Sequence, residues 1–326
     1  MMKFTRRQIG TGAAALGASL ALPSIGRADT YPSQDIHLIC AFPAGSGADV
    51  IVRWYGEKLR AVAKQSVIVE NRVGALGNLA AEYMVRSKPD GYTIYVHGGS
   101  GVAANMHVLR HPSFDAVKTV RVAATINRQP TMMVVAPNRP WKSVAEVTAY
   151  VKEKKDKATY ATTNPLGKVM GAIYRTHYQL EPVEVQYRTA NDCLNDLTSG
   201  TVDYAMLDNI FSASQARQGR VRILAVSTKE RLQANPDIPT MTELGCPMNV
   251  TGWFAAMVPM ATPRPVVDEI ARMFNEITRS PEAKAFLNSV ASDPWVLTTD
   301  EAQAFLAEEV KSWGEYVKLA KIEPQG

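Results

Sequence analysis

The chain is poor in cysteine, with three in 326 residues, at Cys40, Cys193 and Cys246. They lie far apart, and none shows the CxxC or Cys/His spacing of a metal or redox site. Cys40 lies in an apolar run, where a thiol behaves as a small buried hydrophobic group. An odd number of cysteines leaves room for one disulfide at most. The sequence therefore predicts no metal site.

Motifs of common enzymes are also missing. The chain has no HExxH and no GxSxG, and its glycine-rich stretch at 44–49 is not followed by the Gly-Lys-Ser/Thr of a P-loop. That stretch does not fit a dinucleotide fingerprint either, because Val50 occupies the third glycine position. Only His97 and Asp208, both at the ends of predicted strands, could form an acid–base pair. The sequence favours a binding protein without a cofactor.

Long apolar runs are confined to the N-terminus. Lys3, Arg6 and Arg7 precede an uncharged stretch at 8–26, and residues 26–28, Gly-Arg-Ala, supply the small residues of a cleavage site. Residues 1–28 are therefore predicted to be an export signal. The arginine pair suggests a twin-arginine (Tat) signal, and an ordinary secretory (Sec) signal is the equal alternative. No later segment is long and apolar enough to cross a bilayer.

An excess of positive charge is absent once the signal is set aside. The formal net charge of +5 includes four cations in residues 1–28 and no acidic residue there, which leaves +1 for the mature chain. A nearly neutral chain lacks the basic surface that nucleic-acid binding requires. We therefore predict no nucleic-acid partner.

What is present is an alternation of short apolar runs and helical patterns, typical of an α/β fold with parallel strands. The first series predicts strands at 36–42, 67–69 and 92–97 and helices at 49–64 and 75–86. The second predicts strands at 132–136, 159–162, 183–187, 204–207 and 223–226 and helices at 144–154, 168–178 and 191–199. An apolar run at 253–258 and helices at 266–279, 281–290 and 300–321 follow.

Two such series predict two α/β domains. We expect residues 29–127 together with 250–326 to form domain 1, and residues 128–249 to form domain 2. In open α/β sheets ligands bind beyond the carboxyl ends of the strands. Two domains facing each other would therefore place a ligand cleft between their loops.

Two glycine-rich loops follow strands of the first domain. Residues 44–49, Ala-Gly-Ser-Gly-Ala-Asp, follow the first strand, and residues 98–101, Gly-Gly-Ser-Gly, follow the third. Glycine lets backbone N–H groups approach a ligand, and the positive end of a following helix favours an anion. Taken alone, either loop could equally be an ordinary turn between a strand and a helix. In the first loop, Asp49 would then cap the helix. Side by side, they predict one cradle for an anion.

Polar side chains of the second domain complete the predicted site. Residues 162–164, Thr-Thr-Asn, can either cap the next helix or reach a ligand. Lys168, in the first turn of that helix, opposes the helix dipole unless an anion binds nearby. Arg188 offers a bidentate donor to a carboxylate, or else forms a surface ion pair. Asp208 either accepts a hydrogen bond from the ligand or shapes a turn.

Longer stretches match one known family. They are Phe42-Pro43-Ala44-Gly45-Ser46-Gly47-Ala48-Asp49, Val69-Glu70-Asn71-Arg72, Lys88-Pro89-Asp90-Gly91-Tyr92-Thr93, Gly200-Thr201-Val202-Asp203, Asp208-Asn209, Pro236-Asp237-Ile238-Pro239-Thr240 and Trp253-Phe254. By these residues, spread over essentially the whole mature chain, the sequence resembles the Bug/TctC-type extracytoplasmic solute receptors of tripartite tricarboxylate transporters.

The resemblance implies a type II-like periplasmic binding protein that closes around a small organic carboxylate. It also implies periplasmic location and membrane permease subunits as partners, and we expect a monomer. One carboxylate would be held by backbone amides of the loops at 42–49 and 98–105. The predicted ligand-binding residues are Phe42, Ala44, Gly45, Ser46, Gly47, Asp49, Gly98, Gly99, Ser100, Gly101, Asn105, Thr162, Thr163, Asn164, Lys168, Arg188 and Asp208.

Two departures from the family pattern concern the ligand. Family members usually carry a Gly/Ser-rich loop where this chain has residues 161–168, and commonly Lys-Gly where it has Arg188-Thr189. The cations here predict a second anionic group on the ligand, hence a dicarboxylate, with aromatic diacids such as terephthalate included. Alternatives are a sensor component that feeds a membrane kinase and, less favoured, an enzyme that acts on a carboxylate.

Overall fold

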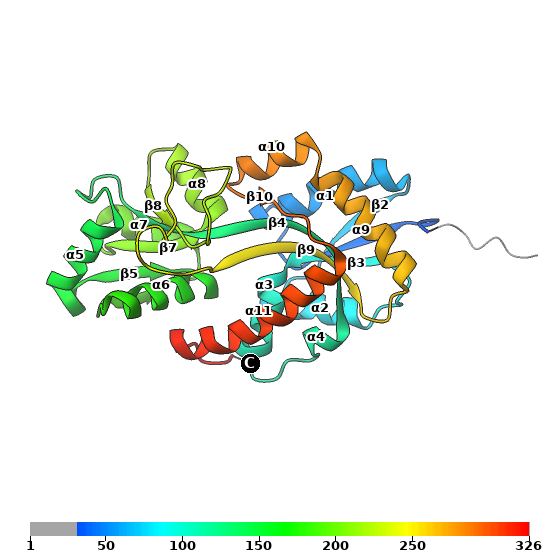
Figure 1. Ribbon diagram of the computed structural model, residues 1–326, viewed down its shortest axis with the longest axis horizontal. Helices are drawn as coiled ribbons and strands as arrows, with labels where there is room; N and C mark the ends of the chain where they lie inside the picture. The colour runs from blue at the N-terminus through cyan, green and yellow to red at the C-terminus, as the bar shows by residue number, and fades with distance from the viewer. Residues whose placement is uncertain (1–30, 326) are drawn as a thin grey trace, which may run out of the picture.

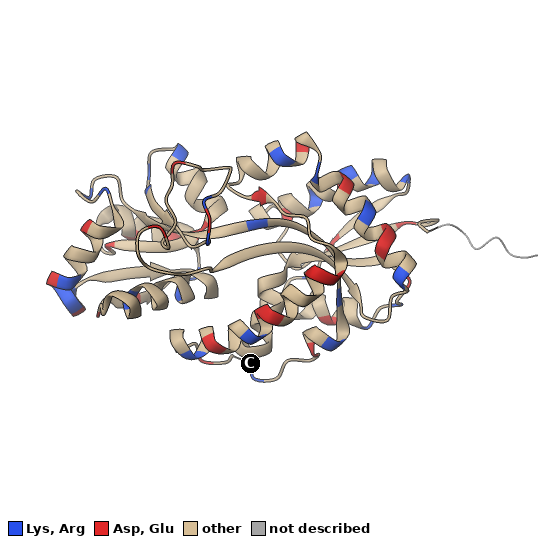
Figure 2. Ribbon diagram, viewed as in Figure 1, with Lys and Arg blue, Asp and Glu red and all other residues tan. Residues whose placement is uncertain are grey.

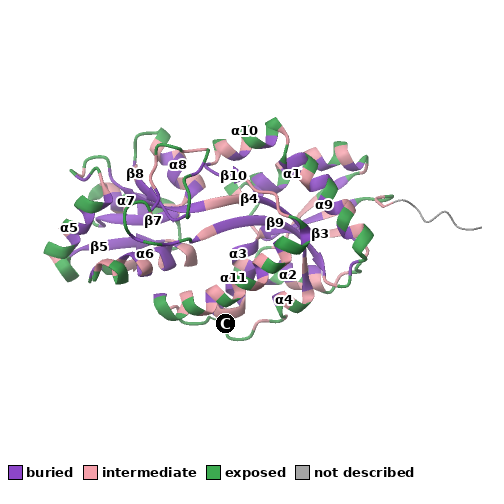
Figure 3. Cartoon of the chain, in the orientation of Figure 1, coloured by how far each residue is buried: buried purple, intermediate pink, exposed green. Residues whose placement is uncertain are grey.

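The computed structural model describes residues 31–325, so the predicted export signal lies outside the described residues. Two α/β halves are joined by two long strands, β4 (Val120–Val135) and β9 (Thr251–Pro259) (Figure 1). The strands of both halves are largely buried (Figure 3), and charged residues lie mainly on the helices and loops around them (Figure 2). Among the described residues, no helix combines the length and the apolar character that a bilayer span needs.

The first half is built on a five-stranded part of the sheet. Its order is β2 (Val67–Asn71), β1 (Ile36–Cys40), β3 (Thr93–Gly98), β9 and β4. β1 is parallel to β2 and β3, whereas β9 is antiparallel to both β3 and β4. The prediction of a parallel sheet is therefore confirmed for β1–β3 and wrong where the late strand β9 enters.

Alternate residues of β1 face the two helical layers of this half. Leu38 and Cys40 pack in a buried cluster with α1 (Gly47–Ala63) and α9 (Arg264–Thr278), while Ile39 packs with α2 (Asn78–Val85) and α3 (Gly99–Val108). Period-two alternation is what a strand covered on both faces requires. The remaining elements of this half are η1 (Ala75–Gly77), α4 (Ala116–Thr119), α10 (Pro281–Ser289) and β10 (Asp293–Pro294).

The second half continues the same sheet from β4. The order is β4, β7 (Tyr204–Asp208), β5 (Thr159–Thr162) and β6 (Val183–Gln186), and β8 (Arg222–Val226) pairs with β4 as well. β5 is parallel to β6 and β7, as the alternating pattern predicts. The helices of this half are α5 (Val144–Lys154), η2 (Lys155–Lys157), α6 (Pro165–Tyr178), α7 (Ala190–Ser199) and α8 (Asn209–Arg217).

β4 belongs to both halves. It pairs with β9 as far as Pro130 and with β7 from Thr131 onward. Only its last part, near 132–136, was predicted as a strand, since the polar residues 127–129 resemble a linker. The division into 29–127 with 250–326 and 128–249 remains a prediction.

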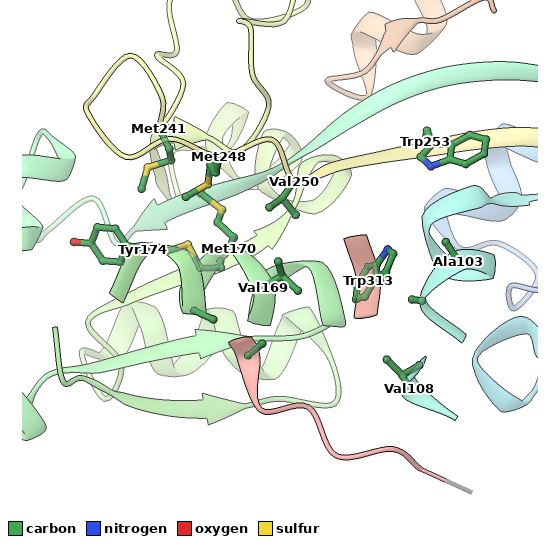
Figure 4. Close-up of a cluster of buried hydrophobic side chains, with 14 of the residues drawn as sticks. Ala103, Val108, Val169, Met170, Tyr174, Met241, Met248, Val250, Trp253 and Trp313 are labelled. Carbon is green, nitrogen blue, oxygen red and sulfur yellow. The ribbon is translucent and has the colours of Figure 1, made fainter. Parts of the chain in front are cut away.

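α11 (Thr299–Ala320) runs along the first half and reaches the second (Figure 1). Near its start the Gln303 amide accepts a hydrogen bond from Val122 N and donates one to Val120 O of β4. Farther along, Trp313 lies between Val169 of α6 and Ala103 of α3 in one buried cluster (Figure 4). The prediction that the C-terminal helices return to domain 1 therefore omits the contact of α11 with α6.

Residues 98–105, predicted as a loop, are largely helical. α3 begins at Gly99, directly after β3, with Gly98 as its N-cap. The predicted helix 75–86 is divided into η1 and α2, because Leu76 adopts a left-handed φ of 54°. All three cysteines lie in the described region, and each is buried with a free thiol.

Candidate functional site

A cavity of about 380 Å³ lies between the two halves. Its lining residues are Ala41, Phe42, Val73, Gly74, Leu76, Gly77, His97, Gly98, Ser100, Gly101, Ala104, Asn105, Val108, Gln129, Asn164, Pro165, Leu166, Phe254 and Trp313. Not one of these described residues is Lys, Arg, Asp or Glu. The volume and the mostly apolar wall are typical of a small-molecule site, and any charge on a ligand must be met by backbone or neutral groups.

The start of α3 supplies the polar end of the cavity. Ser100 and Gly101 lie in the first turn of this helix and line the cavity. The N-cap, Gly98, contributes no side-chain hydrogen bond. Because the first N–H groups of a helix have no partner within the helix, and the dipole is positive there, this end can bind an anion.

Gly99 allows the helix to start so close to β9. A Cβ atom at Gly99 would lie 2.2 Å from Cζ2 of Trp253, so only glycine fits against the indole ring. Gly99 itself does not line the cavity. Its role is to let the N-terminus of α3 pack on Trp253, which is fully buried.

His97 contributes a neutral ring to the cavity. It is 5% exposed, and its ring lies 4.6 Å from that of Phe42 and 5.0 Å from that of Tyr95, centroid to centroid. Burial lowers the pKa of His97 to about 3, so it is uncharged near neutral pH. Its Nδ1 atom has no hydrogen-bond partner among the described residues.

The predicted acid–base pair of His97 and Asp208 is not assembled at the cavity. Asp208 accepts a hydrogen bond of 2.9 Å from Phe211 N as the N-cap of α8, and it does not line the cavity. Asp208 therefore lies at the turn between β7 and α8 and caps the helix. Of the two roles that the sequence allows for Asp208, this is the one that shapes a turn.

Three amide side chains line the cavity. Asn105 donates from Nδ2 to Leu76 O at 3.1 Å, which ties α3 to the left-handed turn. Asn164 accepts from Gly167 N at 2.9 Å as the N-cap of α6. Gln129 of β4 has a buried Oε1 without a partner in residues 31–325. Asn105 and Asn164 thus stabilise the backbone around the cavity, and the Oε1 atom of Gln129 remains without a hydrogen bond.

The first glycine loop lies outside the cavity lining apart from Phe42, and several of its amides bond internally. Gly45 N donates to Asp49 Oδ2 at 2.8 Å, and Ser46 N donates to Pro43 O at 3.1 Å. A Cβ atom at Gly47 would lie 3.0 Å from Ile210 of the second half. Of the predicted residues in this loop (Phe42, Ala44, Gly45, Ser46, Gly47 and Asp49), only Phe42 lines the cavity.

Asp49 holds this loop in shape. Its carboxylate accepts from Arg53 Nε at 2.8 Å and Asn71 Nδ2 at 2.7 Å, in addition to Gly45 N. Burial alone would raise the pKa of Asp49, but the hydrogen bonds from Arg53, Asn71 and Gly45 outweigh it and hold the pKa below its usual value. The buried carboxylate is therefore structural.

Replacing Asp49 by asparagine is expected to lower the free energy of unfolding by about 1–2 kcal/mol at pH 7, because charge-assisted hydrogen bonds are lost. Since the folded-state pKa is depressed, this contribution is present above the unfolded pKa of 3.8 and disappears as the pH falls through the folded value. Urea unfolding at pH 7 and pH 3 measures both effects, with the exposed Asp237→Asn as control. Equal losses at the two pH values would contradict this assignment.

The cations predicted from the second half also lie outside the lining. Lys168 Nζ is 3.9 Å from Glu184 Oε1, and Arg188 is exposed. Thr162 donates its hydroxyl to the same Glu184 atom at 2.9 Å. Of the predicted residues in this half, Asn164 lines the cavity, whereas Thr162, Thr163, Lys168, Arg188 and Asp208 do not.

Sequence reasoning missed most of the apolar wall. Leu166 lies two residues after the predicted Asn164, and Leu76 lies between Gly74 and Gly77, so local signals existed for both. Gln129 lies in the stretch 126–130, which the sequence predicts as a crossing between the domains. Trp313 lies on α11, far from any predicted loop, and nothing in its sequence neighbourhood connects it with the cavity.

Comparisons with known proteins agree with this architecture. Residues 51–322 match the TctC model, described as the tripartite tricarboxylate transporter family receptor. Protein BugT of Bordetella pertussis is 27% identical over 323 residues, which cover 97% of this chain and 98% of BugT. The chain therefore belongs to the TctC family.

Solved structures show the same fold. Rpa4515 of R. palustris, solved with adipate, is 25% identical with a TM-score of 0.79, over 90% of this chain and 100% of that one. Periplasmic binding protein BugD superimposes with a TM-score of 0.75 at 24% identity, over 90% and 100%. The chain has the α/β fold of the periplasmic binding proteins and is a solute receptor of the TctC/Bug type.

Proposed function

We propose that the protein captures a small organic carboxylate in the cavity between its halves and delivers it to the membrane subunits of a tripartite transporter. The observation that carries this proposal is the uncapped start of α3, where Ser100 and Gly101 face a cavity without charged side chains. Carboxylates are among the small anions that such N–H groups bind. The adipate held by the relative Rpa4515 supports the same ligand class.

The same binding chemistry would serve a sensor that feeds a membrane kinase, and the genes that adjoin this one would discriminate between the two roles. An enzyme acting on the carboxylate is less favoured, because the neutral His97 lacks the acidic partner that the sequence suggested. We further propose that residues 1–28 direct export to the periplasm by the Tat or Sec route, and that the receptor acts as a monomer.

The number of carboxylates that the cavity can bind depends on the charged groups in its walls. Rpa4515 was solved with adipate, an aliphatic diacid, and the sequence of this chain predicts a dicarboxylate, aromatic diacids such as terephthalate included. Lys168 and Arg188, on which that prediction rests, do not line the cavity.

A thermal-shift screen of the mature protein tests the function. Mono-, di- and tricarboxylates, amino acids and aromatic acids are each added in excess, with the corresponding amides as neutral controls. A ligand at about 100 times its Kd stabilises the native state by roughly 2.7 kcal/mol, so a clear rise in Tm is expected for at least one acid and for no amide. Absence of a shift with every carboxylate, or turnover of a bound acid, would overturn the proposal.

A further inference from the structure

We infer that the ligand is a monocarboxylate with an apolar body, bound with its carboxylate at the N-terminus of α3 and its body against the apolar wall. This inference rests on the proposed function and specifies its substrate class. It differs from the dicarboxylate that the isolated sequence predicts.

The cavity has one anion-binding end. At the start of α3, Ser100 is 5% exposed and lines the cavity beside Gly101, and its hydroxyl has no hydrogen-bond partner within residues 31–325. His97, equally buried, also lines the cavity and leaves Nδ1 without a partner. The first-turn N–H groups of α3 and the Ser100 hydroxyl are neutral donors that can surround one carboxylate without a cationic side chain.

The other helix that reaches the cavity cannot hold a second carboxylate in the same way. α6 begins with Pro165, which has no N–H group, and Gly167 N already donates to Asn164 Oδ1. Only Leu166 is left to offer a free first-turn N–H at that end. The two helix starts are therefore unequal, although both face the cavity.

The remaining wall is apolar and carries no compensating charge. Val73, Leu76, Ala104, Val108, Leu166 and Trp313 form most of it. Two cations next to this wall in sequence face acidic partners: Arg72, which precedes Val73, is 3.0 Å from Glu70, and Lys168, two residues after Leu166, is 3.9 Å from Glu184. An acidic group, Glu309, lies behind the wall beside the indole of Trp313. A second carboxylate would lose hydration here and could gain only uncharged donors, the Leu166 N–H and the Gln129 amide, which disfavours diacids.

Matched acid pairs test this inference by calorimetry on the mature protein at neutral pH. Hexanoate is compared with adipate, and benzoate with terephthalate, so that each pair differs by one carboxylate. We expect the monoacid to bind at least about tenfold more tightly in the pair that fits. Along the aliphatic series, affinity should rise about fourfold per added methylene until the cavity is full.

The outcomes separate the two proposals. A diacid that binds as tightly as its monoacid, or more tightly, overturns the monocarboxylate inference and leaves the receptor function intact. Failure of every carboxylate overturns both. Hexanamide binding as well as hexanoate would show that the start of α3 does not select an anion, and this also contradicts the inference.

A charge placed in the wall supplies an independent check. Leu76→Lys introduces a cation at a lining position that is 51% exposed. It should strengthen adipate binding at least about fivefold and weaken hexanoate binding. Leu79→Lys is the matched control, since Leu79 is 53% exposed and does not line the cavity. If Leu76→Lys leaves the ratio of the two affinities unchanged, the ligand body does not contact this wall.

Discussion

Ser100→Asp is expected to abolish carboxylate binding while the protein remains folded. The new side chain would lie in the first turn of α3 and face the cavity, where it competes with the ligand for the same N–H groups. Loss of those donors and repulsion between two carboxylates should weaken binding at least about 100-fold, equivalent to roughly 2.7 kcal/mol. Isothermal titration with the best acid from the screen measures the loss.

The unliganded variant should remain folded. An acidic side chain in an exposed first turn contributes about 0.3–1 kcal/mol through the helix dipole, and at Ser100, which is 5% exposed, this interaction offsets part of the cost of burying a carboxylate. Ser100→Asn, which has nearly the same shape and no charge, is the control and should retain most of the affinity. If Ser100→Asp binds the acid within threefold of the wild type, the carboxylate is not held at α3.

Glu309→Gln is expected to stabilise the protein at pH 8 and to leave it nearly unchanged at pH 5. Burial raises the pKa of Glu309 from 4.5 to about 7, although the indoles of Trp253 and Trp313 partly oppose this. Between these values the folded state binds more protons than the unfolded chain, so stability falls as the pH rises. At pH 8 the ionised carboxylate costs roughly 2–3 kcal/mol, which glutamine removes.

Urea denaturation of wild type and variant from pH 5 to 8 measures this difference. Glu308→Gln is the matched control, because Glu308 is exposed and its ion pair with Lys311 lies at the surface. Surface pairs of this kind contribute about 0–1 kcal/mol. A Glu309 variant that loses stability at pH 8, or differs equally from wild type at both ends of the range, would contradict the raised pKa of this carboxyl.

Much of the fold could be predicted from local patterns. The apolar run of β1, the helical period of α1 and the βαβ order up to β3 depend on neighbouring residues, and the structure confirms them. The pairing of strands that are far apart in the sequence leaves no such local pattern. Asn127 has the polarity of a linker residue, yet its side chain accepts a hydrogen bond from Phe254 N in the centre of the sheet.

The candidate site could be predicted in part. Glycines marked the start of α3, because a close approach of backbone to an indole or a ligand needs small residues. The same glycines led to a wrong prediction: because glycine has a low helix propensity, residues 98–105 were expected to form a loop, whereas α3 begins at Gly99. The role of Lys168 could not be judged from sequence, because its neighbour Glu184 lies on another strand. Trp313 enters the cavity only through the packing of α11.

The position of β9 dictates the order in which this chain can be completed during synthesis. Thr251–Pro259 lies between β3 and β4, and it pairs with both. A nascent chain that ends before residue 251 therefore exposes two unsatisfied strand edges, which invite association with other chains. We expect the sheet of the first half to be completed only when the last quarter of the polypeptide has been made, and a chaperone that covers those edges should have its greatest effect during that interval.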